Sequence, residues 1–222
     1  MAFLFIIAII LFILPWLIIP LAIFFLFNLL LLPFGFTLRS LLNLITIPKQ
    51  IWQIALNRRL RINHALEHAT INVLEEHYGP QKLAGFAQED GFFLKGTVQP
   101  NMLEEAARIG LGRMLRGEHN LAVHDRCGTS IAAANFLAAI VFILLLLVTH
   151  QFTLLNVVLA MITANLLGPF LGKWLQTHFT TLTDVGNVEI VGVEYRTPHY
   201  GLFPIQLGFI PMEYFVRTRF YH

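Results

Sequence analysis

The residues best suited to chemistry lie in a short motif of two histidines and a glutamate, His64-Ala65-Leu66-Glu67-His68. If this stretch is helical, His64 and His68 share one face, with their Cβ atoms about 6 Å apart. Both imidazoles can then bind one metal ion, and imidazole is a common zinc ligand. Glu67 projects near the same face, where it could polarise a metal-activated water as general base. We predict His64 and His68 as metal ligands and Glu67 as a catalytic residue.

A second cluster, from His119 to Cys127, contains two histidines, an aspartate and the single cysteine of the chain. The spacing of His124 and Cys127 lets two side chains share a metal across a tight turn. Asp125 could instead orient a ligating histidine. The zinc site that we predict combines both clusters and uses His64, His68, His124 and Cys127. Four ligands would make a closed structural site, whereas three ligands and a water would make a catalytic one.

Both clusters also have a structural interpretation. The main apolar stripe of the predicted helix lies nearly opposite the histidines and consists of Ile62, Leu66, Ala69 and Val73. The histidine face could therefore be solvated or interfacial, or the helix could be packed on two sides and enclose the site. The second cluster could be a loop that caps the following apolar helix, with its cysteine as a small apolar filler.

The H-x-x-E-H pattern resembles that of the inverted zinc metallopeptidases. This resemblance implies zinc-dependent hydrolysis with Glu67 as the base. It covers five residues, and those peptidases take a third ligand, a glutamate, from a helix well downstream. No acidic residue occurs from Ser130 to Thr183 in this chain. The chain therefore lacks the third ligand of the peptidase pattern in this region.

Two long apolar stretches place these clusters beside a membrane. Charged side chains are absent from Met1 to Leu38 and from Ser130 to Gly172, and only 13% of residues are charged. About 20 apolar residues cross the hydrocarbon of a bilayer. We predict an integral membrane, mainly α-helical protein with about three transmembrane helices and a small cytoplasmic α+β insert. The net charge of +2 gives no indication of nucleic acid binding.

The predicted organisation has four parts in chain order. They are an N-terminal membrane anchor and interfacial segment (1–56), a cytoplasmic α+β unit (57–128), a transmembrane hairpin (129–175) and a C-terminal cytoplasmic strand and tail segment (176–222). Residues 1–32 contain Pro15 and Pro20 and form either one kinked span, which we favour, or a re-entrant pair. Residues 33–56 are apolar but short between breakers, which is typical of an interfacial segment.

The α+β unit is predicted to contain a helix over Asn57–His77 and a hairpin around Glu89-Asp90-Gly91. A second helix from Pro100 and a third strand at Leu121–Val123 follow it. Beyond the membrane hairpin, Val188–Tyr195 alternates like a strand. Five basic residues precede the first acidic residue, and they are Arg39, Lys49, Arg58, Arg59 and Arg61. By the positive-inside rule, the insert and the C-terminus face the cytoplasm.

Three sequence blocks together resemble a family of uncharacterised membrane proteins found mainly in cyanobacteria. The blocks are NHALEHATI at 63–71, LAGFAQEDGFFLKG at 83–96 and EHNLAVHDRCGT at 118–129. The resemblance covers residues 57–175 and implies a cytoplasmic unit followed by a membrane hairpin, but no established activity. A cyanobacterial setting implies the thylakoid or plasma membrane.

Two functions therefore stand side by side. The first is a bilayer-embedded metal protein, with zinc the expected metal and hydrolysis the expected activity. The second is a non-enzymatic accessory or assembly subunit of a membrane complex, such as a photosynthetic one. A hydrolase needs an open metal position and a path for water, whereas an accessory subunit needs a docking surface.

Overall fold

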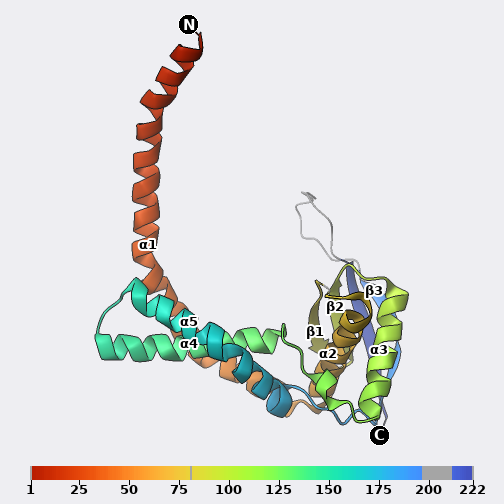
Figure 1. The fold of residues 1–222 in the computed structure, drawn as a ribbon. Helices are drawn as coiled ribbons and strands as arrows, with labels where there is room; N and C mark the ends of the chain where they lie inside the picture. Colours follow the sequence, from red (N-terminus) through yellow and green to blue (C-terminus); the bar gives the residue numbers. More distant parts are fainter. Residues whose placement is uncertain (1, 81, 197–211, 222) are drawn as a thin grey trace.

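Long apolar helices on one side and a small α+β unit on the other make up the part of the chain that the structure describes (Figure 1). This computed structural model describes residues 2–80, 82–196 and 212–221. Within them, three helical stretches are long and apolar enough to cross a membrane, namely Ile18–Leu56, Gly128–Thr149 and Leu154–Thr180. The expected mainly helical fold with about three such helices and a small sheet is confirmed.

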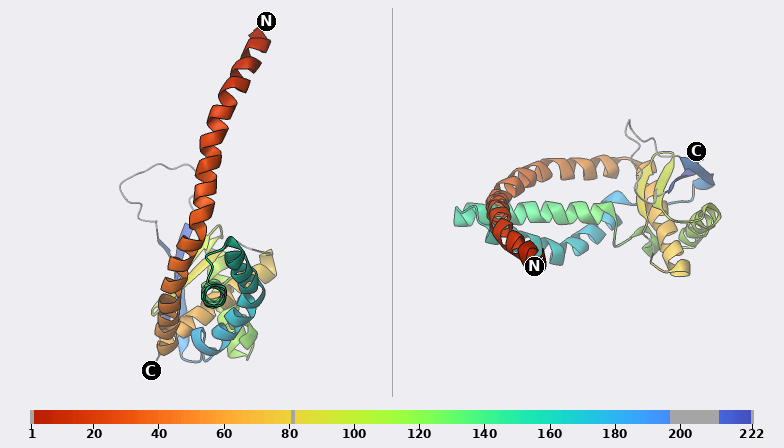
Figure 2. Two further views of the ribbon diagram at one scale, coloured as in Figure 1. Left: turned by 90° about the vertical axis from the view of Figure 1, so that its left-hand side faces the viewer. Right: turned by 90° about the horizontal axis from the view of Figure 1, so that it is seen from above.

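The first helix, α1, is continuous from Ala2 to Leu56. At 1.5 Å per residue it is about 80 Å long, well beyond the thickness of a bilayer core. It bends along its course, and its N-terminal part projects away from the other apolar helices (Figures 1 and 2). The favoured single helix is therefore confirmed over the described residues. The expected breaks after residue 32 were wrong, because the helix continues through Pro33 and Pro48. Apolar surroundings favour keeping the remaining backbone hydrogen bonds of a helix even where proline removes one.

Helices α4 (Gly128–Thr149) and α5 (Leu154–Leu175) form the predicted hairpin. Small residues let their backbones approach closely. A Cβ added to Gly168 would lie 2.6 Å from Ala134 Cβ, and one added to Gly172 would lie 2.6 Å from Ser130 Cα. Apolar helices commonly pack through such small residues. This packing fixes the start of α4 against the end of α5.

Helix α2 (Arg58–Tyr78) is the centre of the α+β unit. It begins after Asn57, whose side chain accepts a hydrogen bond from the Leu60 backbone N–H, and it ends at Gly79. Residues 62–71 are all buried, whichever face they occupy. Helix α3 (Pro100–Leu115) packs closely against α2, since a Cβ added to Gly110 would lie 3.2 Å from Ala69. The helix is therefore packed on two sides, and the solvated face that we considered for the histidines is excluded.

A four-stranded antiparallel sheet covers this helix, with the order β1-β2-β4-β3 among the described residues. Its strands are β1 (Ala84–Gln88), β2 (Gly91–Gly96), β3 (Val188–Arg196) and β4 (Met212–Phe220). The predicted hairpin and the predicted strand at 188–195 are confirmed. Strand β4 was not predicted, although Tyr214 and Val216 are buried and the charged residues Arg217 and Arg219 lie at alternate positions. The sheet therefore combines segments from before and after the α4–α5 hairpin.

The predicted third strand at Leu121–Val123 was wrong. The chain forms a short 3-10 helix, η1, over His119–Ala122 instead. Its backbone carbonyls accept hydrogen bonds from α2 side chains: the Asn72 amide donates to Leu121 O and to Val123 O. These hydrogen bonds satisfy the backbone carbonyl groups of the segment, so it needs no neighbouring strand.

Candidate metal centre

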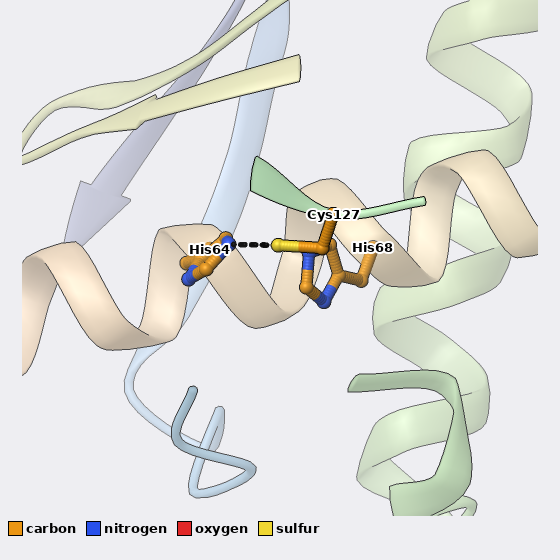
Figure 3. Close-up of side chains that lie close together, drawn as sticks. All are labelled: His64, His68 and Cys127. Atoms are coloured by element: carbon orange, nitrogen blue, oxygen red, sulfur yellow. Dashed lines mark hydrogen bonds between the residues drawn. The ribbon is translucent and has the colours of Figure 1, made fainter. Parts of the chain in front are cut away.

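Three side chains from the two predicted clusters converge where α2 meets the start of α4 (Figure 3). One ligand atom each from His64, His68 and Cys127 lies within 4.8 Å of the other two, and all three residues are buried. The His64 Nε2 and Cys127 Sγ atoms are 3.2 Å apart. This group could hold a metal ion, and we call it the His/His/Cys group.

Backbone carbonyls set the orientation and the tautomer of both histidines. The Nδ1 of His64 is 2.9 Å from Thr180 O, and the Nδ1 of His68 is 2.8 Å from Ala122 O. Because a carbonyl can only accept, each Nδ1 donates its proton, and each neutral ring keeps a lone pair on Nε2. Metal-binding histidines usually have this arrangement, in which the second ring nitrogen donates to a carbonyl or carboxylate.

The Nε2 atom of His68 is buried and has no hydrogen-bond partner within the described residues. An unsatisfied polar atom of this kind is costly unless something binds it. Burial lowers the pKa of His68 well below its ordinary value of 6.5, and the neighbouring His64 lowers it further. The ring is therefore neutral at physiological pH, which is the form that binds metals.

Cys127 is held at the N-terminus of α4, where its Sγ accepts a hydrogen bond from the Thr129 backbone N–H at 3.3 Å. Burial raises the pKa of the thiol, while the hydrogen bonds from Thr129 and Ser130 lower it. A nearby cation would favour the thiolate strongly. The loop therefore caps the helix, as the structural interpretation expected, but the cap is Cys127 itself, which we had considered an apolar filler. The same cysteine completes the His/His/Cys group.

Glu67 lies beside this group but is not one of its three residues. The pKa of Glu67 is raised to about 8, chiefly by burial. The neighbouring His64 lowers this pKa, and Cys127 raises it. Its carboxyl group lies against Gly85 on strand β1, because a Cβ added there would overlap the carboxylate. The absence of a side chain at Gly85 therefore gives Glu67 its place.

A cavity of about 280 Å³ opens next to Glu67, His64 and Cys127. Four elements border it: α1, α2, β1 and the start of α4. Its other lining residues are Gln50, Ile51, Ile54, Leu60, Gly85, Phe86, Ala87, Gly128, Thr129 and Ala132. The cavity therefore lies at the junction between the apolar helices and the sheet.

The structure does not bring His124 into the same group. Its Nε2 lies 3.4 Å from Glu75 Oε2, and its ring centre is 6.1 Å from that of His68. Asp125 does not orient a histidine either, since it forms an ion pair with Lys173 at 2.8 Å. Three of the four predicted ligands therefore come together.

Gln176 supports the group and was not identified from the sequence. It is fully buried in the π-helical turn Gln176–Thr180, called η2, at the end of α5. Its side chain accepts from His124 N at 2.9 Å and donates to His124 O and Ser130 Oγ. The same turn supplies the Thr180 carbonyl that orients His64. In the sequence, Gln176 is one polar residue after an apolar helix, and nothing else distinguishes it.

The fold and the group together define a class of protein with three helices suited to crossing a membrane, a small α+β unit and a buried His/His/Cys group at their junction. The chain belongs to the family described as a domain of unknown function, DUF6391, whose model matches residues 59–193. It is 34% identical over 156 residues to an uncharacterised protein of Picosynechococcus sp., covering 64% of this chain and 75% of that protein. No solved structure matches the chain. The expected relationship to an uncharacterised family with a cyanobacterial relative is confirmed.

Proposed function

We propose that this protein is an integral membrane zinc hydrolase, with His64, His68 and Cys127 as ligands and Glu67 as general base. The observation that carries the proposal is the orientation of the two histidines. The Nδ1 hydrogen bonds turn both Nε2 lone pairs toward the group: His64 Nε2 lies 3.2 Å from Cys127 Sγ, and His68 Nε2 is buried without a partner within the described residues. The thiol of Cys127 lies within reach of both rings.

The donor set supports zinc and a catalytic type of site. Two imidazoles and one thiolate suit zinc, and three protein ligands leave its fourth position for water or substrate. The cavity borders His64 and Cys127, so this position has space beside it. A bound zinc ion would polarise a carbonyl group and lower the pKa of a water molecule.

Glu67 is suited to move a proton in such a reaction. Water adds to the carbonyl carbon of the substrate, and Glu67 accepts the proton that the water releases. The bond from this carbon to the leaving nitrogen or oxygen then breaks, and Glu67 donates the proton to the leaving atom. In the metal-free fold, burial raises the pKa of Glu67 to about 8, which favours its protonated form near neutral pH. A bound zinc ion would lower this pKa and so favour the carboxylate that accepts the proton.

The proposal places α1, α4 and α5 across a bilayer, with the plasma or thylakoid membrane as the location. The length and apolar composition of these helices support insertion. The basic residues around α2 support a cytoplasmic α+β unit and C-terminus. His124, paired with Glu75, is assigned to the surroundings of the centre and not to the ligands.

Metal analysis of the full chain purified in detergent tests the proposal. We expect about one zinc ion per chain in the wild type and almost none in the His64→Ala/His68→Ala double variant. The matched control, His77→Ala/His119→Ala, removes two exposed histidines and should keep the metal.

A wild-type protein without zinc, or a double variant with unchanged zinc, would contradict the centre. If the metal-free wild type also kept a stable partner through purification, the accessory-subunit function would replace the hydrolase.

A further inference from the structure

Strand β1 is an open edge of the sheet. Within the described residues it pairs with β2 on one side only. A two-residue turn joins the strands, so the flanking residues Gln88 and Gly91 exchange hydrogen bonds and every second residue after them does the same. The backbone N–H and C=O groups of Gly85 and Ala87 therefore point away from β2. No backbone hydrogen bond from the described loops reaches residues 84–88.

The open edge and the reactive side chains border the same space. Gly85 and Ala87 line the cavity together with His64, Glu67 and Cys127. At the hairpin end, the Asn63 amide donates to Gln88 O at 2.7 Å, and Glu67 lies against Gly85, so α2 packs on the face of the strand. The outward edge of Gly85 and Ala87 receives no backbone hydrogen bond from the described loops. A chain paired with the middle of β1 would therefore lie over the candidate centre.

We propose that the substrate is an extended polypeptide segment that adds to β1 as a further antiparallel or parallel strand. This inference rests on the proposed hydrolase and names its substrate class. Outward N–H and C=O groups at Gly85 and Ala87 alternate along the edge, and another polypeptide backbone is the ligand that matches this pattern.

The surroundings of the cavity narrow this class further. Ile51 and Ile54 of α1 and Ala132 of α4 form an apolar wall facing the strand. The bound segment therefore lies next to the membrane, with one flank on the sheet edge and the other on the apolar helices. In the reaction, water adds to a peptide carbonyl carbon, the C–N bond breaks, and Glu67 transfers the proton from water to the departing amine.

Binding of a peptide probe to the zinc-loaded, full-length protein in detergent tests this inference without requiring turnover. The probe is a fluorescein-labelled pentapeptide ending in a hydroxamate, which binds zinc. Two analogues carry N-methyl groups on alternate residues. In an extended peptide, the methyl groups of one analogue block the N–H groups of one edge, and those of the other analogue block the opposite edge. We expect about tenfold weaker binding, by fluorescence anisotropy, for one analogue only, because one edge loses its backbone hydrogen bonds. Equal binding of all three peptides, or no binding of the parent, would overturn the inference.

A protein variant gives an independent measurement. Ala87→Pro removes one outward N–H, and proline is tolerated at a strand edge where the N–H is not paired within the sheet. We expect about tenfold weaker binding of the parent peptide, with unchanged binding of acetohydroxamate, which reports on zinc alone. Ala87→Ser keeps the N–H and should bind the peptide normally. If Ala87→Pro loses zinc, binding of the two N-methylated peptides to the wild-type protein still shows whether a peptide pairs with β1.

The outcomes separate this inference from the proposed hydrolase. Edge-dependent peptide binding without turnover of any peptide would reject the hydrolase and keep the binding site. Zinc binding with edge-independent peptide binding would keep the centre and reject the polypeptide substrate. Competition by short-chain phosphatidylcholine, together with equal binding of the two analogues, would identify a lipid substrate instead and overturn the inference.

Discussion

At the scale of single residues, His68 connects the fold to the proposed chemistry. Its Nδ1 is bonded to Ala122 O, its Nε2 is unsatisfied within the described chain, and its pKa is lowered by burial. A histidine that served packing alone would gain from satisfying both nitrogens. The arrangement is the one that the proposed zinc ion at Nε2 would require.

Glu67→Gln should separate catalysis from structure. The amide keeps the shape of the side chain but cannot accept the proton, so turnover should fall by roughly 10²- to 10⁴-fold while zinc content stays unchanged. The measurement is hydrolysis of a peptide substrate alongside metal analysis. Glu104→Gln, at a half-exposed ion pair with Arg108, is the control and should retain activity. Full activity of Glu67→Gln would exclude Glu67 as the base.

The raised pKa of Glu67 predicts a pH effect on the zinc-free protein. Its pKa is 4.5 in the unfolded chain and about 8 in the fold, so the folded state holds a proton that the unfolded state releases in this range. The free energy of unfolding should therefore fall as pH rises from about 4.5 to 8. Thermal unfolding in chelator at pH 5.5 and 7.5 should show this loss in the wild type.

Glu67→Gln is the control for this pH effect, because glutamine does not titrate. His68, whose pKa is lowered, makes both proteins less stable as pH falls below 6.5, so the comparison between them isolates Glu67. The wild type should lose more stability than the variant as pH rises from 5.5 to 7.5. Identical pH profiles would contradict the buried carboxyl.

At the scale of elements, the turn η2 links the end of α5 to the His/His/Cys group. Gln176 holds the backbone of His124 and the side chain of Ser130, while Thr180 orients His64. The residues of the His/His/Cys group come from α2 and from the start of α4, but the alignment of His64 depends on a third element. Movement of α5 would therefore reach the centre through this turn.

Gln176→Leu should weaken zinc binding by up to about tenfold, the lower limit for removing a residue bonded directly to a metal ligand, because Gln176 acts on the ligands only through the turn η2. Thr177→Val, at an exposed neighbouring position, is the control and should bind normally. Competition with a chromogenic chelator measures the affinity. The absorption spectrum of the cobalt-substituted protein should also change in Gln176→Leu, which a general loss of stability would not cause. An unchanged spectrum and affinity would show that Gln176 does not position the residues of the His/His/Cys group.

Gly172→Ala tests the close packing of α4 on α5. The added methyl group would meet Ser130, so we expect the free energy of unfolding to fall by about 1 to 3 kcal/mol. Gly35→Ala in α1 is the control, because nothing lies within 4 Å of a Cβ there. Denaturation in mixed detergent micelles compares the two variants. If the two variants had equal free energies of unfolding, the close contact of Gly172 with Ser130 would be contradicted.

The sequence predicted most helices because their apolar periodicity, caps and breakers are local signals. The same was true of the β1–β2 hairpin and of the His64-to-His68 spacing on α2. Strand β4 was missed because the aromatic residues near Tyr214 obscured its alternation. Gln176 was missed because its role depends on contacts with residues about 50 positions away. That Cys127 joins the histidines while His124 faces Glu75 depends on side-chain direction, which spacing alone does not determine.

At the scale of the whole molecule, we propose that the α+β unit combines residues 57–128 with the strands of 176–222, on one side of the membrane. An even number of crossings, α4 and α5, returns the chain to the side on which it started. The short link after Thr149 then lies on the opposite side. The orientation of the protein can therefore be measured from the sides on which the α+β unit and this link lie.

Single cysteines in a Cys127→Ser background should reveal this orientation. Gln151→Cys lies in the exposed link between α4 and α5, and Glu105→Cys lies on the exposed face of α3. After expression in a bacterial plasma membrane, a membrane-impermeant maleimide added to intact cells should label Gln151→Cys and not Glu105→Cys. Both should react after lysis, which controls for accessibility. The reverse pattern in intact cells would place the α+β unit outside.

The pairing of β2 with β4 has a consequence for biosynthesis. Gly91 pairs with Arg217, so the two partners are 217 − 91 = 126 positions apart in the chain. At ribosomal rates of 5–20 residues per second, β2 waits on the order of ten seconds for its neighbour. The Thr180 carbonyl that orients His64 likewise emerges only after both α4 and α5 have been made. A nascent chain therefore cannot complete the His/His/Cys group, with the Thr180 hydrogen bond that orients His64, before the helical hairpin has been synthesised.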